Sequence, residues 1–167
     1  IARLKEKVDC GVDFITTQMF FDNEKFYNFR EMCAIKEINI PIIAGIMPIT
    51  NANQIKRSVE LSNASLPVKF SKIMERFGEN PDAMKQAGIV YATEQIIDLM
   101  ANGVNNIHIY TMNKPDVAHQ IMEGLSAIIN EFSCVPSFIV FKKFFHYFHI
   151  SSLLANETTC IKPLPTI

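Results

Sequence analysis

Three segments of this chain repeat one pattern, in which an apolar strand ends in polar residues and a helix begins directly afterwards. The segments are 13–22 (DFITTQMFFD), 40–50 (IPIIAGIMPIT) and 105–115 (NNIHIYTMNKP). The middle strand is apolar on both faces, as expected for a parallel strand that is covered on both sides. Strands that alternate with helices in this way predict an α/β fold, specifically a (β/α)8 TIM barrel, whose chemistry takes place where the strands end.

The length of the chain limits how much of such a barrel it contains. A complete barrel needs about 250 residues, and this chain has 167. The chain also begins with Ile1, and its first residues are typical of the end of a helix closed by Gly11. We therefore expect a fragment of a TIM barrel, holding the last three strand–helix units, with strands at 14–17, 40–46 and 107–111.

Residues that favour helix starts follow each predicted strand. They are Asn23, Asn51, Pro67, Asn80 with Pro81 and Asp82, and Pro115. The signal at Asn80 is the clearest, because an N-cap, a proline with a fixed φ and an acid in the first turn occur together. It predicts a long helix that ends near Gly103.

Charge and cysteine usage restrict the function classes. The 16 basic and 17 acidic residues are balanced and form no basic run, so nucleic acid and anionic membranes are not expected partners. A small neutral or anionic ligand fits better. The four cysteines form no CxxC pair, and no signal peptide is recognisable, which favours the cytoplasm.

The composition changes near residue 130. Six of the 13 phenylalanines lie between Phe132 and Phe148, in a stretch without a clean helical or strand period. Lys142 and Lys143 interrupt every apolar run of the roughly 20 residues that a membrane span requires. We expect residues 1–130 to form the barrel domain and residues 131–167 to form an unrelated tail with few contacts to it. The His146–His149 pair in this tail is interpreted as coincidence, and no metal site is expected.

The candidate site residues lie at the three strand ends. They are Thr17, Gln18 and Asp22, then Gly45, Met47, Pro48, Thr50 and Asn51, and finally Tyr110, Thr111, Asn113 and Lys114. The primary amide of Gln18 is the most informative, because its donors and acceptor suit a planar ring with an amino group beside a carbonyl. The alternative is that Gln18 caps backbone groups at the rim.

Other strand-end residues narrow the chemistry. Gly45 either lets a ligand approach the backbone or marks a tight strand end, and Asp22 is as readily a helix cap as a catalyst. His108 alternates with apolar residues and is interpreted as a hydrogen-bonded barrel residue more readily than as a base. Because no lysine lies within or directly at a strand end, this chain offers no Schiff-base residue.

Four stretches carry a family resemblance. KVDCGVDFITTQMFFD, PIIAGIMPITNANQIKR, FGENPDAMKQAGIVYATEQIIDLMANGV and IHIYTMNKP, in this order across residues 7–125, closely resemble the carboxyl-terminal part of bacterial methylenetetrahydrofolate reductase. The resemblance implies an eight-stranded barrel with noncovalent FAD. It implies hydride transfer from NADH or NADPH to 5,10-methylenetetrahydrofolate, an oxidoreductase reaction on a CH–NH bond in one-carbon and methionine metabolism.

The same resemblance assigns roles to particular residues. It implies that Gln18 pairs with the folate pterin and serves the nicotinamide half-reaction, that Gln54 and Lys114 border the substrate, and that Lys7 contacts FAD. No catalytic residue is assigned within this chain, because the family's acids lie on earlier strands. The chain alone is therefore expected to be inactive, and the resemblance leaves a homo-oligomeric parent open.

Two departures and two alternatives accompany this interpretation. Ser58 stands where relatives carry a substrate-stacking phenylalanine, and Lys114 stands where many carry arginine, which weakens any bidentate recognition. One alternative is another β/α-barrel enzyme of pterin or aldol chemistry, which the absence of a strand-end lysine disfavours. The other is a truncated, non-catalytic barrel fragment.

Overall fold

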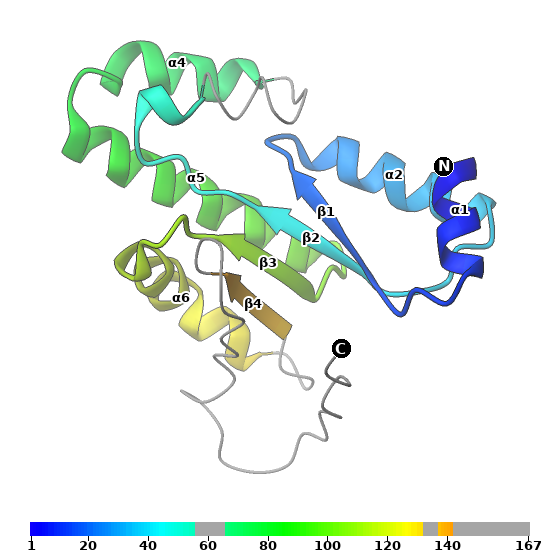
Figure 1. Ribbon diagram of the computed structural model, residues 1–167. Coiled ribbons are helices and arrows are strands. Elements are labelled where there is room, and N and C mark those ends of the chain that lie inside the picture. Colours follow the sequence, from blue (N-terminus) through cyan, green and yellow to red (C-terminus); the bar gives the residue numbers. More distant parts are fainter. Residues whose placement is uncertain (56–65, 132–136, 142–167) are drawn as a thin grey trace.

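The computed structural model describes residues 1–55, 66–131 and 137–141 and contains a parallel sheet flanked by helices (Figure 1). The sheet has four strands in the order β1-β2-β3-β4. They are β1 (Ile15–Met19), β2 (Ile42–Ile46), β3 (Asn106–Tyr110) and β4 (Ser137–Phe141). The helices are α1 (Ala2–Asp9), α2 (Asn23–Ile35), α4 (Val68–Phe77), α5 (Pro81–Ala101) and α6 (Pro115–Asn130).

The topology confirms the predicted α/β class. All three strand pairs are parallel, and each strand lies beside the next one along the chain. Sequential parallel strands with intervening helices are the arrangement found in part of a β/α barrel. The three predicted strands are all present, with ends shifted by no more than two residues.

The main core lies between β2, β3 and the helices that follow them. Ala44 and Ile46 of β2 pack with Ile107 and Ile109 of β3 against buried residues of α5 and α6. The residues in these strands alternate between the two faces of the sheet, so these four share the face that the helices cover. On α5 the buried partners include Ile96 and Leu99, and on α6 they include Ile121 and Leu125.

Most of the predicted helix signals act as expected. The Asn80 side chain accepts hydrogen bonds from the backbone N–H groups of Asp82 and Ala83 at 3.1 Å, with Pro81 as the first helical residue. Asn51 accepts from the N–H of Asn53 at 2.8 Å. The left-handed backbone at Gly11 (φ 103°) and at Gly103 (φ 75°) follows the ends of α1 and α5, where glycine is favoured.

The predicted cap of α2 is wrong by one residue. Asp22 is the N-cap, and its carboxylate accepts from the Glu24 N–H at 3.2 Å. Asn23 is the first helical residue, and its amide donates to the Gln95 carbonyl at 3.0 Å and to the Asp98 carboxylate at 2.6 Å. Both residue types cap helices well, and the tertiary contact with α5 decides between them. Asp22 therefore acts as a helix cap.

The loop between β1 and α2 is fastened to α5 by further hydrogen bonds. The Tyr91 hydroxyl donates to the Phe21 carbonyl at 2.8 Å, and the Gln95 amide donates to the Phe20 carbonyl at 3.0 Å. These contacts join residues about 70 positions apart in sequence. They fix the chain directly after β1, which is where the candidate site begins.

The fourth strand corrects the prediction of three strand–helix units. β4 pairs in parallel with β3 along five residues, from Asn106 with Ser137 to Tyr110 with Phe141. The expectation that the segment after residue 130 makes few contacts is therefore wrong for residues 137–141. Residues 138–141 are all apolar, and a short apolar run has no distinctive period, so the strand could not be recognised from the sequence. The Phe-rich remainder and the His146–His149 pair lie outside the described residues, and the boundary at residue 130 stays a prediction.

Helix α5 approaches the chain after β2 so closely that only glycine fits at one point. A Cβ on Gly88 would overlap the backbone carbonyl oxygen of Ile49, whereas a Cβ on Gly124 of α6 would only touch the Thr93 methyl at 3.4 Å. We expect Gly88→Ala to destabilise the chain by about 1–3 kcal/mol or more, because backbone cannot rotate out of the way as a side chain does. Urea unfolding midpoints measure this effect.

Gly124→Ala is the matched control. The same substitution in the neighbouring helix removes the entropic cost of glycine without a clash, so it should stabilise by about 0.5–1 kcal/mol. Equal midpoints for the two variants would show that α5 does not press against Ile49.

Candidate functional site at the carboxyl ends of the strands

A β-bulge lies at the end of β1 and contains Gln18. Thr16 pairs with Ile43 and Met19 pairs with Gly45, so two residues of β1, Thr17 and Gln18, lie opposite one residue of β2. Bulges bend a strand and redirect its side chains, and they are frequent beside active sites. The sequence did not reveal this irregularity.

Two hydrogen bonds hold the bulge. The Gly45 backbone N–H donates to the Thr17 hydroxyl at 2.9 Å, and the Tyr110 hydroxyl of β3 donates to the Thr17 carbonyl at 3.0 Å. A Cβ on Gly45 would lie 2.5 Å from that carbonyl oxygen and 2.9 Å from the Tyr110 ring. The space beside Gly45 is thus filled by the protein's own backbone and a tyrosine, which agrees with the interpretation of Gly45 as a tight strand end and not with a ligand in that space.

The Gln18 side chain is available to a ligand. It is exposed, and within the described part of the chain no hydrogen bond of its amide is found. The interpretation of Gln18 as a rim cap therefore has no support in these residues. An exposed amide with two donors and an acceptor at a strand's carboxyl end can pair with a planar heterocycle.

Lys114 and Gln54 meet through one buried hydroxyl. The Lys114 ammonium donates to the Thr50 hydroxyl at 2.7 Å, and the Thr50 hydroxyl donates to the Gln54 side-chain oxygen at 3.3 Å. The Thr50 N–H also donates to the same oxygen at 3.3 Å. Thr50 is only 6% exposed. Two of the predicted substrate-side residues are therefore held together by Thr50, whose role as a bridge the sequence did not show.

Among the described residues, the Lys114 ammonium has a hydroxyl and no carboxylate beside it. Lys114 is bonded to a neutral hydroxyl, and no ion pair of Lys114 is found among the residues that the structure describes. A half-buried ammonium held in this way attracts an anionic group of a ligand. The Gln54 oxygen is engaged by Thr50, so its amide donors remain for such a ligand.

Lys7 lies apart from these residues. It is exposed on α1, a helix with no buried residue, and α1 leads through residues 10–14 into the amino end of β1. Gln18, Gln54 and Lys114 lie at or beyond the carboxyl ends of the strands. The structure therefore brings Gln54 and Lys114 into one network, whereas α1, the helix of Lys7, precedes β1 in the chain (Figure 1).

His108 is buried within the sheet. It is 4% exposed, and its ring lies 4.2 Å from the Tyr110 ring, centroid to centroid. Burial lowers the pKa of His108 to about 4, because a charged imidazolium loses its hydration there. His108 is thus neutral near pH 7 and supports the ring of Tyr110, in keeping with a structural role.

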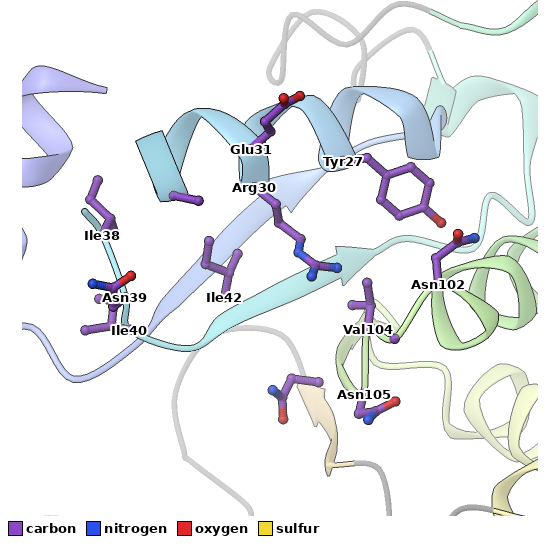
Figure 2. Close-up of a pocket in the computed structure, with 13 residues that line it drawn as sticks. Tyr27, Arg30, Glu31, Ile38, Asn39, Ile40, Ile42, Asn102, Val104 and Asn105 are labelled. Atoms are coloured by element: carbon purple, nitrogen blue, oxygen red, sulfur yellow. The ribbon is translucent and has the colours of Figure 1, made fainter. Parts of the chain in front are cut away.

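A large hollow lies at the other end of the strands. It has a volume of about 620 Å³ and is lined by α2, by the segment before β2 and by the segment before β3. Figure 2 shows the Arg30 side chain extending from α2 into this hollow, near Ile42 and Val104. None of Gln18, Gln54 and Lys114 lines it. Ligands of β/α barrels bind at the carboxyl ends of the strands, so we place the candidate site there and not in this hollow.

The described residues contain neither a membrane-spanning helix nor a cluster of metal-ligating side chains. None of their helices is both long and apolar enough to cross a membrane. Within the same residues, no three His, Cys, Asp or Glu side chains gather in a way that could hold a metal ion.

Most of this chain is similar in sequence to known proteins. The sequence profile described as "Methylenetetrahydrofolate reductase" matches residues 1–126, about three quarters of the chain. The chain belongs to the methylenetetrahydrofolate reductase family. This membership confirms the resemblance drawn from the strand-end motifs.

Individual relatives agree with the family match. The chain is 37% identical over 128 residues to "Methylenetetrahydrofolate reductase (NADH) 1" of Arabidopsis thaliana. The aligned residues make up 77% of this chain and 22% of the relative. It is 36% identical over 121 residues to the "5,10-methylenetetrahydrofolate reductase" of Buchnera aphidicola, an alignment that covers 72% of this chain and 41% of the relative. It is 30% identical over 125 residues to the protein of that name in Escherichia coli, an alignment that covers 75% of this chain and 42% of the relative. The chain thus spans well under half the length of these relatives.

The burial of His108 predicts a dependence of stability on pH. Its pKa is about 4 in the folded chain and about 6.5 when unfolded. Between these values the unfolded state binds a proton that the folded state does not, so stability falls as the pH drops from about 6.5 to 4, by about 3 kcal/mol in total. His108→Gln should flatten this part of the curve. Unfolding midpoints in urea across this pH range measure it.

His119→Gln is the control for the same experiment, because His119 has a 79% exposed side chain on α6. It should leave the pH profile of the parent chain unchanged. If His108→Gln retains the full acid-dependent loss, the buried imidazole is not its source.

Proposed function

We propose that the protein containing this chain reduces 5,10-methylenetetrahydrofolate to 5-methyltetrahydrofolate with NADH or NADPH and uses FAD as its cofactor. The observation that carries this proposal is the Gln18 amide, exposed on a bulge at the carboxyl end of β1 in a chain of the methylenetetrahydrofolate reductase family. The expected setting is cytoplasmic, and a homo-oligomeric protein remains part of the proposal.

Three residues of this chain would contact the substrate. Gln18 would pair with the amino and oxo edge of the pterin, because its amide supplies both a donor and an acceptor. Lys114, held by Thr50 and without a carboxylate partner among the described residues, would meet the negative charge of the folate or of the dinucleotide. Gln54 would donate from its amide nitrogen, since Thr50 already engages its oxygen.

The residues of this chain fit FAD only in part, because Lys7, the one residue assigned to FAD, lies on α1 before the amino end of β1 and not with Gln54 and Lys114 at the strand ends. The Lys7 ammonium is exposed, and no ion pair with it is found among the described residues, so its chemistry suits a pyrophosphate oxygen. When bound, FAD would supply the hydride chemistry. The acids that protonate the folate in the family are expected outside this chain, so no catalytic residue is assigned here.

The Gln18 proposal predicts a selective defect. In the complete protein, Gln18→Ala should leave pterin groups unpaired and weaken folate binding by roughly 1–3 kcal/mol per group. Gln18→Glu keeps the size and an acceptor but loses the amide donor, so oxidation by folate should suffer more than reduction by NAD(P)H. Stopped-flow measurement of each half-reaction separates the two. A wild-type folate half-reaction in Gln18→Ala would make Gln18 a mere rim residue.

A second candidate is a truncated barrel piece without catalysis. In the described sheet β1 has β2 as its one neighbour, so residues 1–167 on their own would present the other edge of β1. Open edges invite pairing with other chains. We expect residues 1–167, purified alone, to be marginally stable or to aggregate and to contain no flavin. Absorbance near the flavin bands and light scattering measure both, and a yellow monomer with stoichiometric flavin contradicts the expectation.

A further inference from the structure

We propose that Tyr110 is a positioning residue for Gln18, because its hydroxyl and ring fix the bulge from which the Gln18 amide is presented. This inference rests on the proposed role of Gln18 and adds a residue for which neither the family match nor the motifs gave a role. Its evidence is a set of contacts that spans three strands.

The Tyr110 side chain extends from β3 past β2 and bonds the backbone of β1. It belongs to β3, and its hydroxyl donates to the Thr17 carbonyl of β1 at 3.0 Å. β2 lies between these strands, and the residue in the path of the ring is Gly45, where a Cβ would lie 2.9 Å from the ring. The contact therefore depends on the absence of a side chain at Gly45.

At the bulge, backbone N–H and C=O groups lose the hydrogen bonds that regular strand pairing would give them. Across a bulge the backbone pairing is locally disrupted, and a buried peptide group that is left unpaired costs about 1–3 kcal/mol. Here the Gly45 N–H donates to the Thr17 hydroxyl, and the Thr17 carbonyl accepts from Tyr110. Side chains thus bond the backbone on both sides of the irregularity, which selects one conformation of the Thr17–Gln18 peptide.

The tyrosine itself is held firmly. Its ring is half-buried in the cluster that contains Met47 and Ile49 and lies 4.2 Å from the His108 ring. Burial also raises the pKa of Tyr110, so the hydroxyl keeps its proton and remains a donor at neutral pH. A rigid donor fixes the carbonyl directly before Gln18, and the direction of the Gln18 side chain follows from it.

The test compares two tyrosines that make the same kind of bond. Tyr110→Phe removes the bond to Thr17 and keeps the ring. Tyr91→Phe removes an equivalent bond, from a half-buried hydroxyl to the Phe21 carbonyl at 2.8 Å, in the same apolar cluster. Both are made in the complete protein, alone and combined with Gln18→Ala. The measurements are folate affinity by calorimetry and backbone amide exchange over residues 16–19.

Tyr110→Phe should weaken folate binding roughly five- to tenfold, the value of one such hydrogen bond, and speed amide exchange at the bulge. In the Gln18→Ala background it should cause no further loss, because the residue that it positions is gone. Tyr91→Phe should lower stability and leave folate affinity close to wild type.

Two failures are distinguishable. If Gln18→Ala leaves folate affinity unchanged, the proposed role of Gln18 in folate binding is wrong. If Gln18→Ala weakens binding but Tyr110→Phe does not, or if the two losses add in full, Tyr110 does not act through Gln18 and the inference is overturned. Unchanged amide exchange at residues 16–19 in Tyr110→Phe overturns it as well.

Discussion

The close contact between α5 and the chain after β2 organises the whole strand-end rim. Gly88 lets the helix backbone touch the Ile49 carbonyl, and Ile49 directly precedes Thr50. One turn further along the same helix, Tyr91 binds the loop that follows β1. A single helix therefore fixes the chain after two neighbouring strands. Backbone contact of this kind is rigid, because no side-chain rotation can relieve it.

This rigidity explains how residues from different loops form one site. Thr50 is buried at 6% exposure and bonds both Gln54 and Lys114, although the Lys114 contact joins positions 64 residues apart. A flexible lysine loses side-chain entropy when it is held in this way, and a fixed, desolvated hydroxyl offsets that cost. The charge is thereby placed at the rim in advance, which would lower the ordering cost of binding the anionic ligand proposed for Lys114.

Local signals were readable in the sequence, and long-range ones were not. The cap at Asn80 and the glycines after α1 and α5 act within a few residues, so their effects could be predicted. The choice between Asp22 and Asn23 as a cap depended on Gln95 and Asp98, about 70 positions away. The bulge at Gln18 and the pairing of β4 depend on neighbouring strands in the same way. The strand-end pattern and the family resemblance predicted Gln18, Gln54 and Lys114 as site residues and included Thr50 and Tyr110 among the candidates, but the contacts of Thr50 and Tyr110 depend on other strands and could not be predicted.

Gly45 shows why the site and its support must be considered together. A glycine at a strand end suggests that something approaches the backbone closely, and the sequence offered a ligand as one possible occupant. The structure fills that space with the Tyr110 ring and the Thr17 carbonyl. Any larger residue at this position would separate Tyr110 from Thr17 and release the peptide before Gln18. Glycine at position 45 permits the Tyr110–Thr17 contact, and under the proposed role of Gln18 it would serve ligand recognition without touching the ligand.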